Sequence, residues 1–222
     1  MCKCEYSDLG RVGYGEAVEL QRGLIEKRQG GRIPDQLLIL EHPHVITLGR
    51  GGDKSHLLAS EDVLRRAGVS FHHTDRGGDI TYHGPGQIVG YPILDLREWK
   101  RDVTAYVRAV EQVLIDMLAD FGITAGRIPG WTGVWAKDKK VAAIGIHIGR
   151  WVTSHGFALN HTTDLSYFGY IVPCGLTNPV TSMEELGCRS SREEVIAAVV
   201  RHFGRVFERE MISALQKREK AI

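Results

Sequence analysis

The sequence has little that would cross-link the chain or anchor it in a membrane. No apolar run reaches the roughly 18 residues of a transmembrane helix, and the first residues lack the apolar stretch of a secretory signal. The cysteines are Cys2, Cys4, Cys174 and Cys188. Four cysteines at uneven spacing are too few for a disulfide framework in a chain of 222 residues. We therefore expect a cytoplasmic protein with free thiols.

A strong charge of either sign is also lacking. The 28 lysines and arginines almost balance 27 acidic residues, which leaves a formal net charge of +1. No basic cluster is interleaved with aromatic residues, so we expect neither nucleic acid nor a membrane as a partner. An acidic protein could still bind a local basic patch.

The usual cofactor and metal motifs are missing as well. The sequence has no P-loop and no strand–Gly-x-Gly-x-x-Gly–helix unit, so ATP and NAD lack their usual binding sequences. His42-Pro43-His44 and Cys2-Lys3-Cys4 contain metal-ligating residue types without the paired spacing of a zinc site. We expect no cofactor and no metal.

What is present suffices for one hydrophobic core. Hydrophobic residues make up 43% of the chain, and no repeat or Pro/Ser-rich linker divides it, so we expect a single domain over residues 1–222. Apolar spacing and turn residues predict a set of helices and strands. The expected helices are 15–28, 60–68, 102–121 and one beginning at Ser191; the expected strands are 36–41, 45–48, 69–73, 80–83, 88–94, 135–137, 140–148 and 157–160. This irregular mixture predicts an α+β fold rather than regular βαβ winding.

The run from Arg76 to Gln87 is the most unusual stretch, because it sets an arginine and a histidine among four glycines. Glycine lets the backbone approach a ligand closely and adopt positive φ angles. A tight turn between two strands is the alternative explanation. The strands expected on either side place the run at a sheet connection, where ligand-binding loops commonly lie.

A second candidate is the cysteine in Pro173-Cys174-Gly175. The thiolate is the nucleophilic form, and a thiol with a pKa near 8.5 needs an activating group at neutral pH. Lys140 opens an apolar strand and could be that group, since its ammonium would favour the thiolate and its amine could accept the proton. An inert buried cysteine and a solvated lysine are the alternatives. Three histidines compete for the role of base: His83, His155 and His161.

Three motifs together resemble the lipoyl(octanoyl) transferase family, also called lipoate-protein ligase B. They are Arg76-Gly-Gly-x-x-Thr-Tyr-His-Gly-Pro-Gly-Gln87, Lys140-Val-Ala-Ala-Ile-Gly145, and the pair Ser154-His-Gly-Phe-Ala-Leu-Asn160 and Pro173-Cys174-Gly175. The resemblance implies a biotin/lipoate-protein ligase-like fold, with a mixed β-sheet flanked by helices. It also implies that Cys174 carries an acyl thioester and that Lys140 lowers its pKa. The acyl-substrate contacts that it implies are Arg76, Gly77, Gly78, Asp79, Ile80, Thr81, Tyr82, His83, Ala143, Ile144, Gly145, Gly156, Phe157 and Ala158.

The reaction implied by the resemblance is transfer of an octanoyl group from octanoyl-acyl carrier protein to a specific lysine of a lipoyl domain. The acceptors would be the lipoyl domains of 2-oxoacid dehydrogenase complexes and the glycine cleavage H protein, and the enzyme would be a monomer. One alternative with the same fold is an ATP-dependent lipoate- or biotin-protein ligase. The cysteine and the lack of a recognisable adenylate loop count against that alternative. Another is a non-catalytic module that binds lipoyl domains or acyl carriers.

Overall fold

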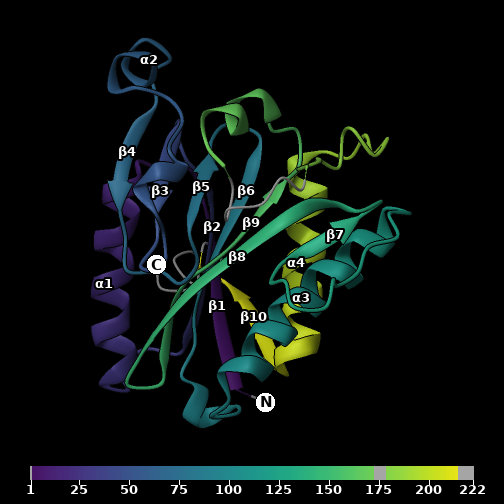
Figure 1. Cartoon of the computed structure of the whole chain (residues 1–222). Coiled ribbons are helices and arrows are strands. Elements are labelled where there is room, and N and C mark those ends of the chain that lie inside the picture. Colours follow the sequence, from purple (N-terminus) through teal and green to yellow (C-terminus); the bar gives the residue numbers. More distant parts are fainter. Residues whose placement is uncertain (1, 173–178, 215–222) are drawn as a thin grey trace.

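Two β-sheets form the framework of the molecule. The computed structural model describes residues 2–172 and 179–214. The larger sheet has seven strands in the order β10-β1-β2-β6-β9-β8-β7, and the smaller sheet has three in the order β4-β3-β5 (Figure 1). The strands are β1 (Cys2–Arg11), β2 (Asp35–Glu41), β3 (Val45–Leu48), β4 (Ser70–His73), β5 (Ile80–His83), β6 (Gln87–Ile93), β7 (Val134–Ala136), β8 (Lys139–Gly149), β9 (Val152–Asn160) and β10 (Arg209–Ser213).

Both sheets are mixed. Strand β1 pairs in parallel with β10 and β2, whereas β2, β6, β9, β8 and β7 pair antiparallel. In the smaller sheet, β3 is parallel to β4 and antiparallel to β5. The α+β class and the mixed sheet flanked by helices that the sequence predicts are therefore confirmed.

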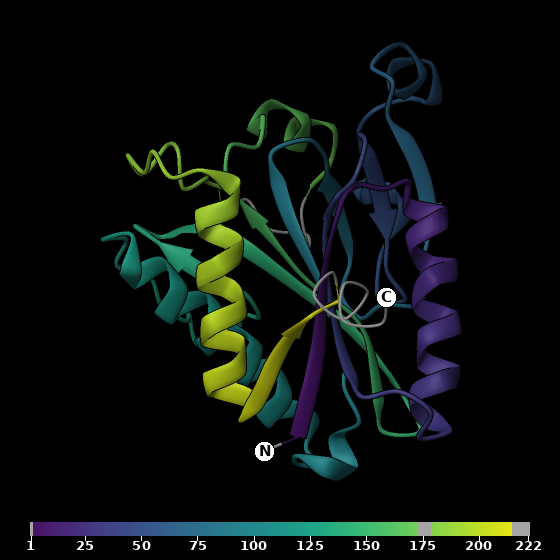
Figure 2. The same ribbon diagram turned by 180° about the vertical axis from the view of Figure 1, so that it is seen from behind.

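Helices cover both faces of the larger sheet (Figures 1 and 2). Helix α1 lies on one side, and α3 and α4 lie on the other. The helices are α1 (Tyr14–Gln29), α2 (Glu61–Arg66), α3 (Val103–Asp120) and α4 (Arg192–Phe207), with short 3-10 helices η1 (Lys54–His56), η2 (Leu96–Glu98) and η3 (Leu165–Tyr170). Within the described residues, none of them is long and apolar enough to cross a membrane.

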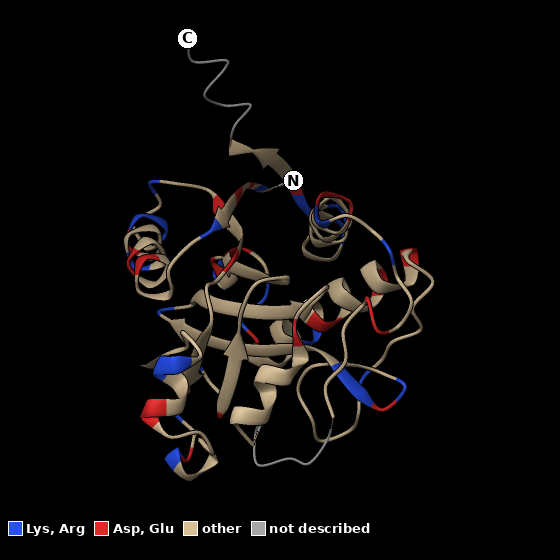
Figure 3. Ribbon diagram, turned by 90° about the horizontal axis from the view of Figure 1, so that it is seen from above, with Lys and Arg blue, Asp and Glu red and all other residues tan. Residues whose placement is uncertain are grey.

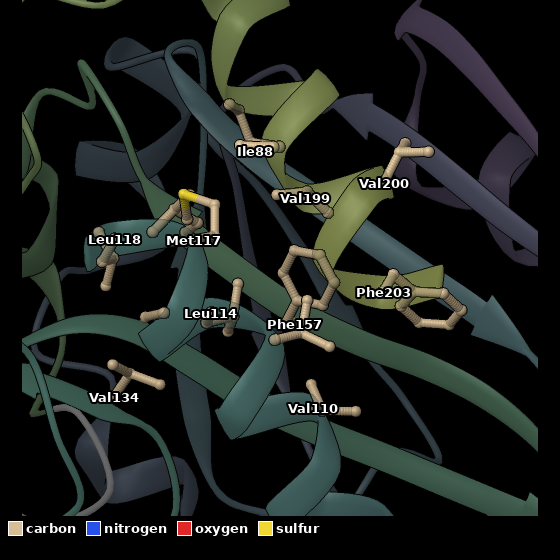
Figure 4. Close-up of a cluster of buried hydrophobic side chains, with 14 of the residues drawn as sticks. Ile88, Val110, Leu114, Met117, Leu118, Val134, Phe157, Val199, Val200 and Phe203 are labelled. Atoms are coloured by element: carbon tan, nitrogen blue, oxygen red, sulfur yellow. The ribbon is translucent and has the colours of Figure 1, made fainter. Parts of the chain in front are cut away.

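The main core lies between the larger sheet and helices α3 and α4. Leu114 of α3, Val199 and Phe203 of α4 and Phe157 of β9 belong to one cluster of buried side chains (Figure 4). These helices carry their apolar residues at a spacing of three and four, so one stripe of each faces the sheet. A smaller core joins α1 to the opposite face of the sheet.

The predicted helix ends are confirmed. The Ser191 side chain accepts a hydrogen bond from the Glu194 N–H while the Glu194 side chain accepts one from the Ser191 N–H, which is a complete capping box. Ser60 caps α2 through its side chain alone, which accepts a hydrogen bond from the N–H of Val63. Gly122, which follows the C-cap residue Phe121 of α3, has a φ of 72°, a conformation that favours glycine.

Two strands, β1 and β10, are not predicted from the sequence, because tertiary contacts stabilise them. Strand β1 is largely polar and exposed, and it forms by pairing with β2 and β10. Strand β10 begins at Arg209, whose buried guanidinium donates to Asp35 at 2.8 Å beside an equally short Arg28–Asp35 ion pair. Charges of both signs are otherwise mixed along the chain (Figure 3).

The β7–β8 hairpin differs from expectation by one residue. Its turn is centred on Lys137 and Asp138, with φ angles of 48° and 62°, instead of Asp138 and Lys139. Two successive positive φ angles are typical of the tight turn that matches the twist of a hairpin. Strand β9 also begins earlier than predicted, at Val152.

Candidate active site

A cavity of about 150 Å³ lies on the face of the larger sheet that α1 also covers. Val89 and Ala158 contribute to its floor, and both pack in the same cluster as Ala17 of α1. Strand β5 and the loop before it supply Ile80 and other residues on the opposite side. The cavity therefore lies between the two sheets, where the Gly-rich run connects them.

Small side chains on neighbouring strands form the floor. The register pairs Ala143 with Ala158 and Gly145 with Gly156, while Val89 of β6 lies opposite Ala158. Residues two apart on a strand point to the same face, so Ala143 and Gly145 share one face, as do Ala158 and Gly156. Larger residues at these positions would fill the space above the sheet.

Lys140 lies at one end of this cavity. Its Nζ is 4.8 Å from the centroid of the Trp135 ring, a favourable cation–π geometry. Its backbone N–H donates to the Pro179 carbonyl at 3.0 Å, and its carbonyl accepts from the Thr181 N–H at 3.0 Å. The segment from residue 179 onward is thus paired with Lys140. Cys174 lies outside the described residues; on its other side, the Val172 N–H donates to the His56 carbonyl at 2.8 Å.

The opposite end of the cavity contains Arg76, which is only 8% exposed. Its guanidinium donates to the Thr47 carbonyl at 2.8 Å and to the Thr47 hydroxyl at 2.9 Å. A methyl group at Gly145 would lie 3.1 Å from Arg76 Cδ, so glycine permits this close approach. Gly145 is five residues from Lys140 on β8, which corresponds to about 16 Å along an extended strand.

The hydrogen bonds around His83 determine its tautomer. Asn160 Nδ2 donates to the Thr181 carbonyl, and Gln87 Nε2 donates to Asn160 Oδ1. Gln87 therefore presents its carbonyl oxygen to His83 Nδ1, 2.7 Å away, so Nδ1 carries the proton and Nε2 carries a lone pair. Burial, together with nearby positive groups, lowers the pKa of His83 to about 3. The imidazole is neutral near pH 7.

His155 and Tyr14 stand together at the same end as Arg76. The backbone N–H of His155 donates to Gln21 Oε1 at 2.8 Å, and the ring nitrogen Nε2 of His155 lies 2.7 Å from Asp75 Oδ1. Burial lowers the pKa of His155, although the Asp75 carboxylate opposes that effect. The Tyr14 hydroxyl donates to Thr74 Oγ1 at 2.9 Å.

The structure gathers most of the residues that the sequence singled out around this one cavity. Gly77 and Tyr82 are not among the described residues that line it. The Tyr82 ring packs against Tyr167 in a separate cluster under the smaller sheet, and the Gly77 N–H donates to the Ile146 carbonyl at 2.8 Å. The predicted residues that line the cavity are Arg76, Gly78, Asp79, Ile80, Thr81, His83, Lys140, Ala143, Ile144, Gly145, Gly156, Phe157 and Ala158.

Other lining residues were not predicted as substrate contacts. Gln87, Tyr91 and Asn160 lie within or next to the motifs that carry the family resemblance, so their sequence signal was present. Tyr14 and Trp131 lie far from those motifs, in a helix start and a loop, and no local pattern marks them.

The chain is similar to curated octanoyltransferases over almost its full length. It is 63% identical to an octanoyltransferase from Solibacter usitatus, covering 96% of both chains. It is 50% identical to one from Acidobacterium capsulatum, covering 92% of this chain and 90% of that protein.

Solved structures share the fold at low identity. A bipartite lipoate protein ligase from Thermoplasma acidophilum matches with a TM-score of 0.75 and 16% identity, covering 98% of this chain and 90% of that one. Lipoate-protein ligase A bound with ATP gives a TM-score of 0.72 at 17% identity, covering 98% and 91%. The model of the lipoyl protein ligase A/B catalytic domain matches residues 13–204. This chain therefore belongs to the octanoyltransferase family and is an acyltransferase with a lipoyl protein ligase A/B catalytic domain.

Proposed function

We propose that this enzyme, as one catalytic domain over residues 1–222, transfers an octanoyl group from octanoyl-acyl carrier protein to a lysine of a lipoyl domain through an acyl thioester on Cys174. The observation that carries the proposal is an apolar-floored cavity with Lys140 at one end, where the segment that follows Cys174 pairs with the Lys140 backbone. The octanoyltransferase relatives support the acyl group. A cytoplasmic monomer without a cofactor stays a prediction from the sequence.

The reaction balances without an external energy source. In the first step the Cys174 thiolate attacks the carbonyl carbon of the carrier thioester, and the carrier thiolate leaves and takes up a proton. In the second step the amine of the acceptor lysine attacks the enzyme thioester, loses a proton, forms an amide and releases the Cys174 thiolate. The first step exchanges one thioester for another, and the second forms the more stable amide.

Lys140 would serve both steps through charge. Its ammonium would favour the Cys174 thiolate as nucleophile and again as leaving group. The stacking of Nζ over Trp135 and the pairing of its backbone limit the positions of this ammonium. Neutral His83 would contribute a fixed hydrogen-bond acceptor in the cavity, since its proton is held on Nδ1. The acceptors would be the lipoyl domains of 2-oxoacid dehydrogenase complexes and the glycine cleavage H protein.

Intact-mass measurement tests the proposal directly. Enzyme incubated with octanoyl-acyl carrier protein, without ATP or magnesium, should gain about 126 Da, the mass of one octanoyl group replacing a proton. The adduct should map to Cys174 and disappear when a lipoyl domain is added. The Cys174→Ser variant is the matched control and should gain no mass. An enzyme that remains unmodified and acylates the lipoyl domain only with free octanoate and ATP would be a ligase instead.

A further inference from the structure

A second, larger cavity lies behind the end of the candidate acyl site that is far from Lys140. Its volume is about 670 Å³, and it extends between α1 and the ends of β8 and β9. Tyr14 and His155 line both cavities. These two side chains are therefore a partition between the acyl site and the second cavity.

The partition is fixed to one short segment of chain. The Tyr14 hydroxyl bonds to Thr74 and the His155 ring bonds to Asp75, so both side chains are held by consecutive residues. Tyr14 is only 6% exposed. The rings of Tyr91 and His155 are nearly perpendicular, with their centroids 6.2 Å apart. His155 itself has a φ of 54°, in the left-handed region that few residues other than glycine adopt.

The length of the first cavity fits a medium acyl chain. Lys140 and Gly145 are about 16 Å apart along β8, and an extended octanoyl group measures about 9 Å from its carbonyl carbon to its methyl carbon. With the carbonyl beside Lys140, the methyl end would lie over the small residues before Tyr14 and His155. Four further methylenes would lengthen the chain by about 5 Å, to about 14 Å between atom centres. The van der Waals radius of the terminal methyl group, about 2 Å, would then bring the chain against the partition.

We propose that Tyr14 and His155 close the far end of the acyl pocket and set the upper limit on acyl-chain length. This inference rests on the proposed octanoyl transfer and specifies its selectivity. The limit is steric and is set by these two side chains, because the second cavity lies directly behind them. Val18 and Ile25 of α1 and Val152 of β9 line that space and could contact a longer chain. Removing the Tyr14 ring would join the two cavities.

A competition assay tests this role. Equimolar octanoyl- and dodecanoyl-acyl carrier protein are supplied together, and the acylated lipoyl domain is quantified by mass. Tyr14→Ala should raise the ratio of dodecanoyl to octanoyl product at least about tenfold, since single methylenes in a fitted pocket already change rates by that order. Tyr14→Phe keeps the ring and should keep the wild-type ratio within a factor of about three.

A double variant separates pocket length from general damage. Tyr14→Ala combined with Val18→Phe places a new ring in the second cavity and should lower the dodecanoyl ratio again. The ratio is independent of the folded fraction, and Tyr14→Leu provides a smaller truncation that should show a smaller increase. If the wild type is active and the ratio is unchanged in both Tyr14→Ala and Tyr14→Leu, the inference on chain length is wrong and the proposed function is unaffected. A wild type that transfers no octanoyl group would instead contradict the proposed function.

Discussion

Lowering the pH from 8 to 5 should weaken the fold through two buried histidines, His42 and His83. Burial lowers the pKa of His42 to about 4 and that of His83 to about 3, from 6.5 in the unfolded chain. The unfolded state therefore binds more protons as the pH falls below 6.5, and stability is lost from that point toward the folded-state pKa values. Linkage gives a loss of about 2 kcal/mol from each histidine at pH 5.

The neutral form of each ring is built into the hydrogen bonding. His42 Nδ1 lies 2.7 Å from the Val12 carbonyl, which can only accept, so Nε2 accepts from the Tyr91 hydroxyl at 2.7 Å. A proton on Nε2 would break that bond and place a charge in the core. Acidic groups also cause a loss of stability as the pH falls, but only at lower pH. The pKa of the Asp95 carboxyl, for example, is lowered chiefly by its hydrogen bonds and ion pair with Arg97, against the effect of burial.

Urea denaturation of the wild type and of His42→Gln at pH 8 and pH 5 measures this effect. Glutamine can donate and accept without titrating, so the variant should lose about 2 kcal/mol less than the wild type between the two pH values. His73→Gln, at an exposed site, is the matched control and should follow the wild type. Equal pH dependence in the wild type and in His42→Gln would refute the reasoning.

Three further predictions concern the site and its support. Gly156→Ala should lower the free energy of unfolding, measured in urea, by about 1–3 kcal/mol, because the new methyl would lie 2.2 Å from a backbone carbonyl of β6. Gly23→Ala on α1 is the control, since the new methyl has open space there and should stabilise the protein slightly. Lys140→Met should shift the pH profile of iodoacetamide alkylation at Cys174 upward while Lys140→Arg shifts it less, and identical profiles would contradict the pairing. Glu111→Gln should destabilise the protein by about 1–3 kcal/mol in urea, because Glu111 is fully buried and binds two arginines that are themselves partly exposed, and an unchanged stability would contradict this reasoning.

The sequence predicts elements whose stability is local and misses those that depend on distant partners. A capping box and an apolar stripe predict helix α4, and an apolar stripe followed by a glycine predicts α3. Strand β10 has neither signal. It forms by pairing with β1, and Arg209 at its start meets Asp35, 174 positions earlier in the chain, in a buried ion pair. No window of sequence contains both partners.

The residues of the candidate site likewise fall into those that local sequence predicts and those that it does not. The Gly-rich run, the first residues of β8 and the motif in β9 together contain most of the residues that line the cavity, so sequence reasoning finds them. Tyr14 reaches the cavity because α1 packs over the sheet, and Trp131 reaches it from the loop before β7. Their positions follow from packing between elements, which residue spacing does not encode.

Fold and chemistry are separable in this protein. The likeness to an ATP-bound ligase at 17% identity shows that the same arrangement of sheets exists in a protein that binds a nucleotide. The chemistry then depends on the side chains that the fold carries, and here the cavity ends at a lysine whose backbone pairs with the segment after Cys174. A lysine placed beside a thiol favours a thiolate, and a thiolate can accept an acyl group from a thioester without nucleotide activation. The position of Lys140 is therefore the feature from which the proposed chemistry follows, and its variants test that chemistry more directly than any comparison of folds.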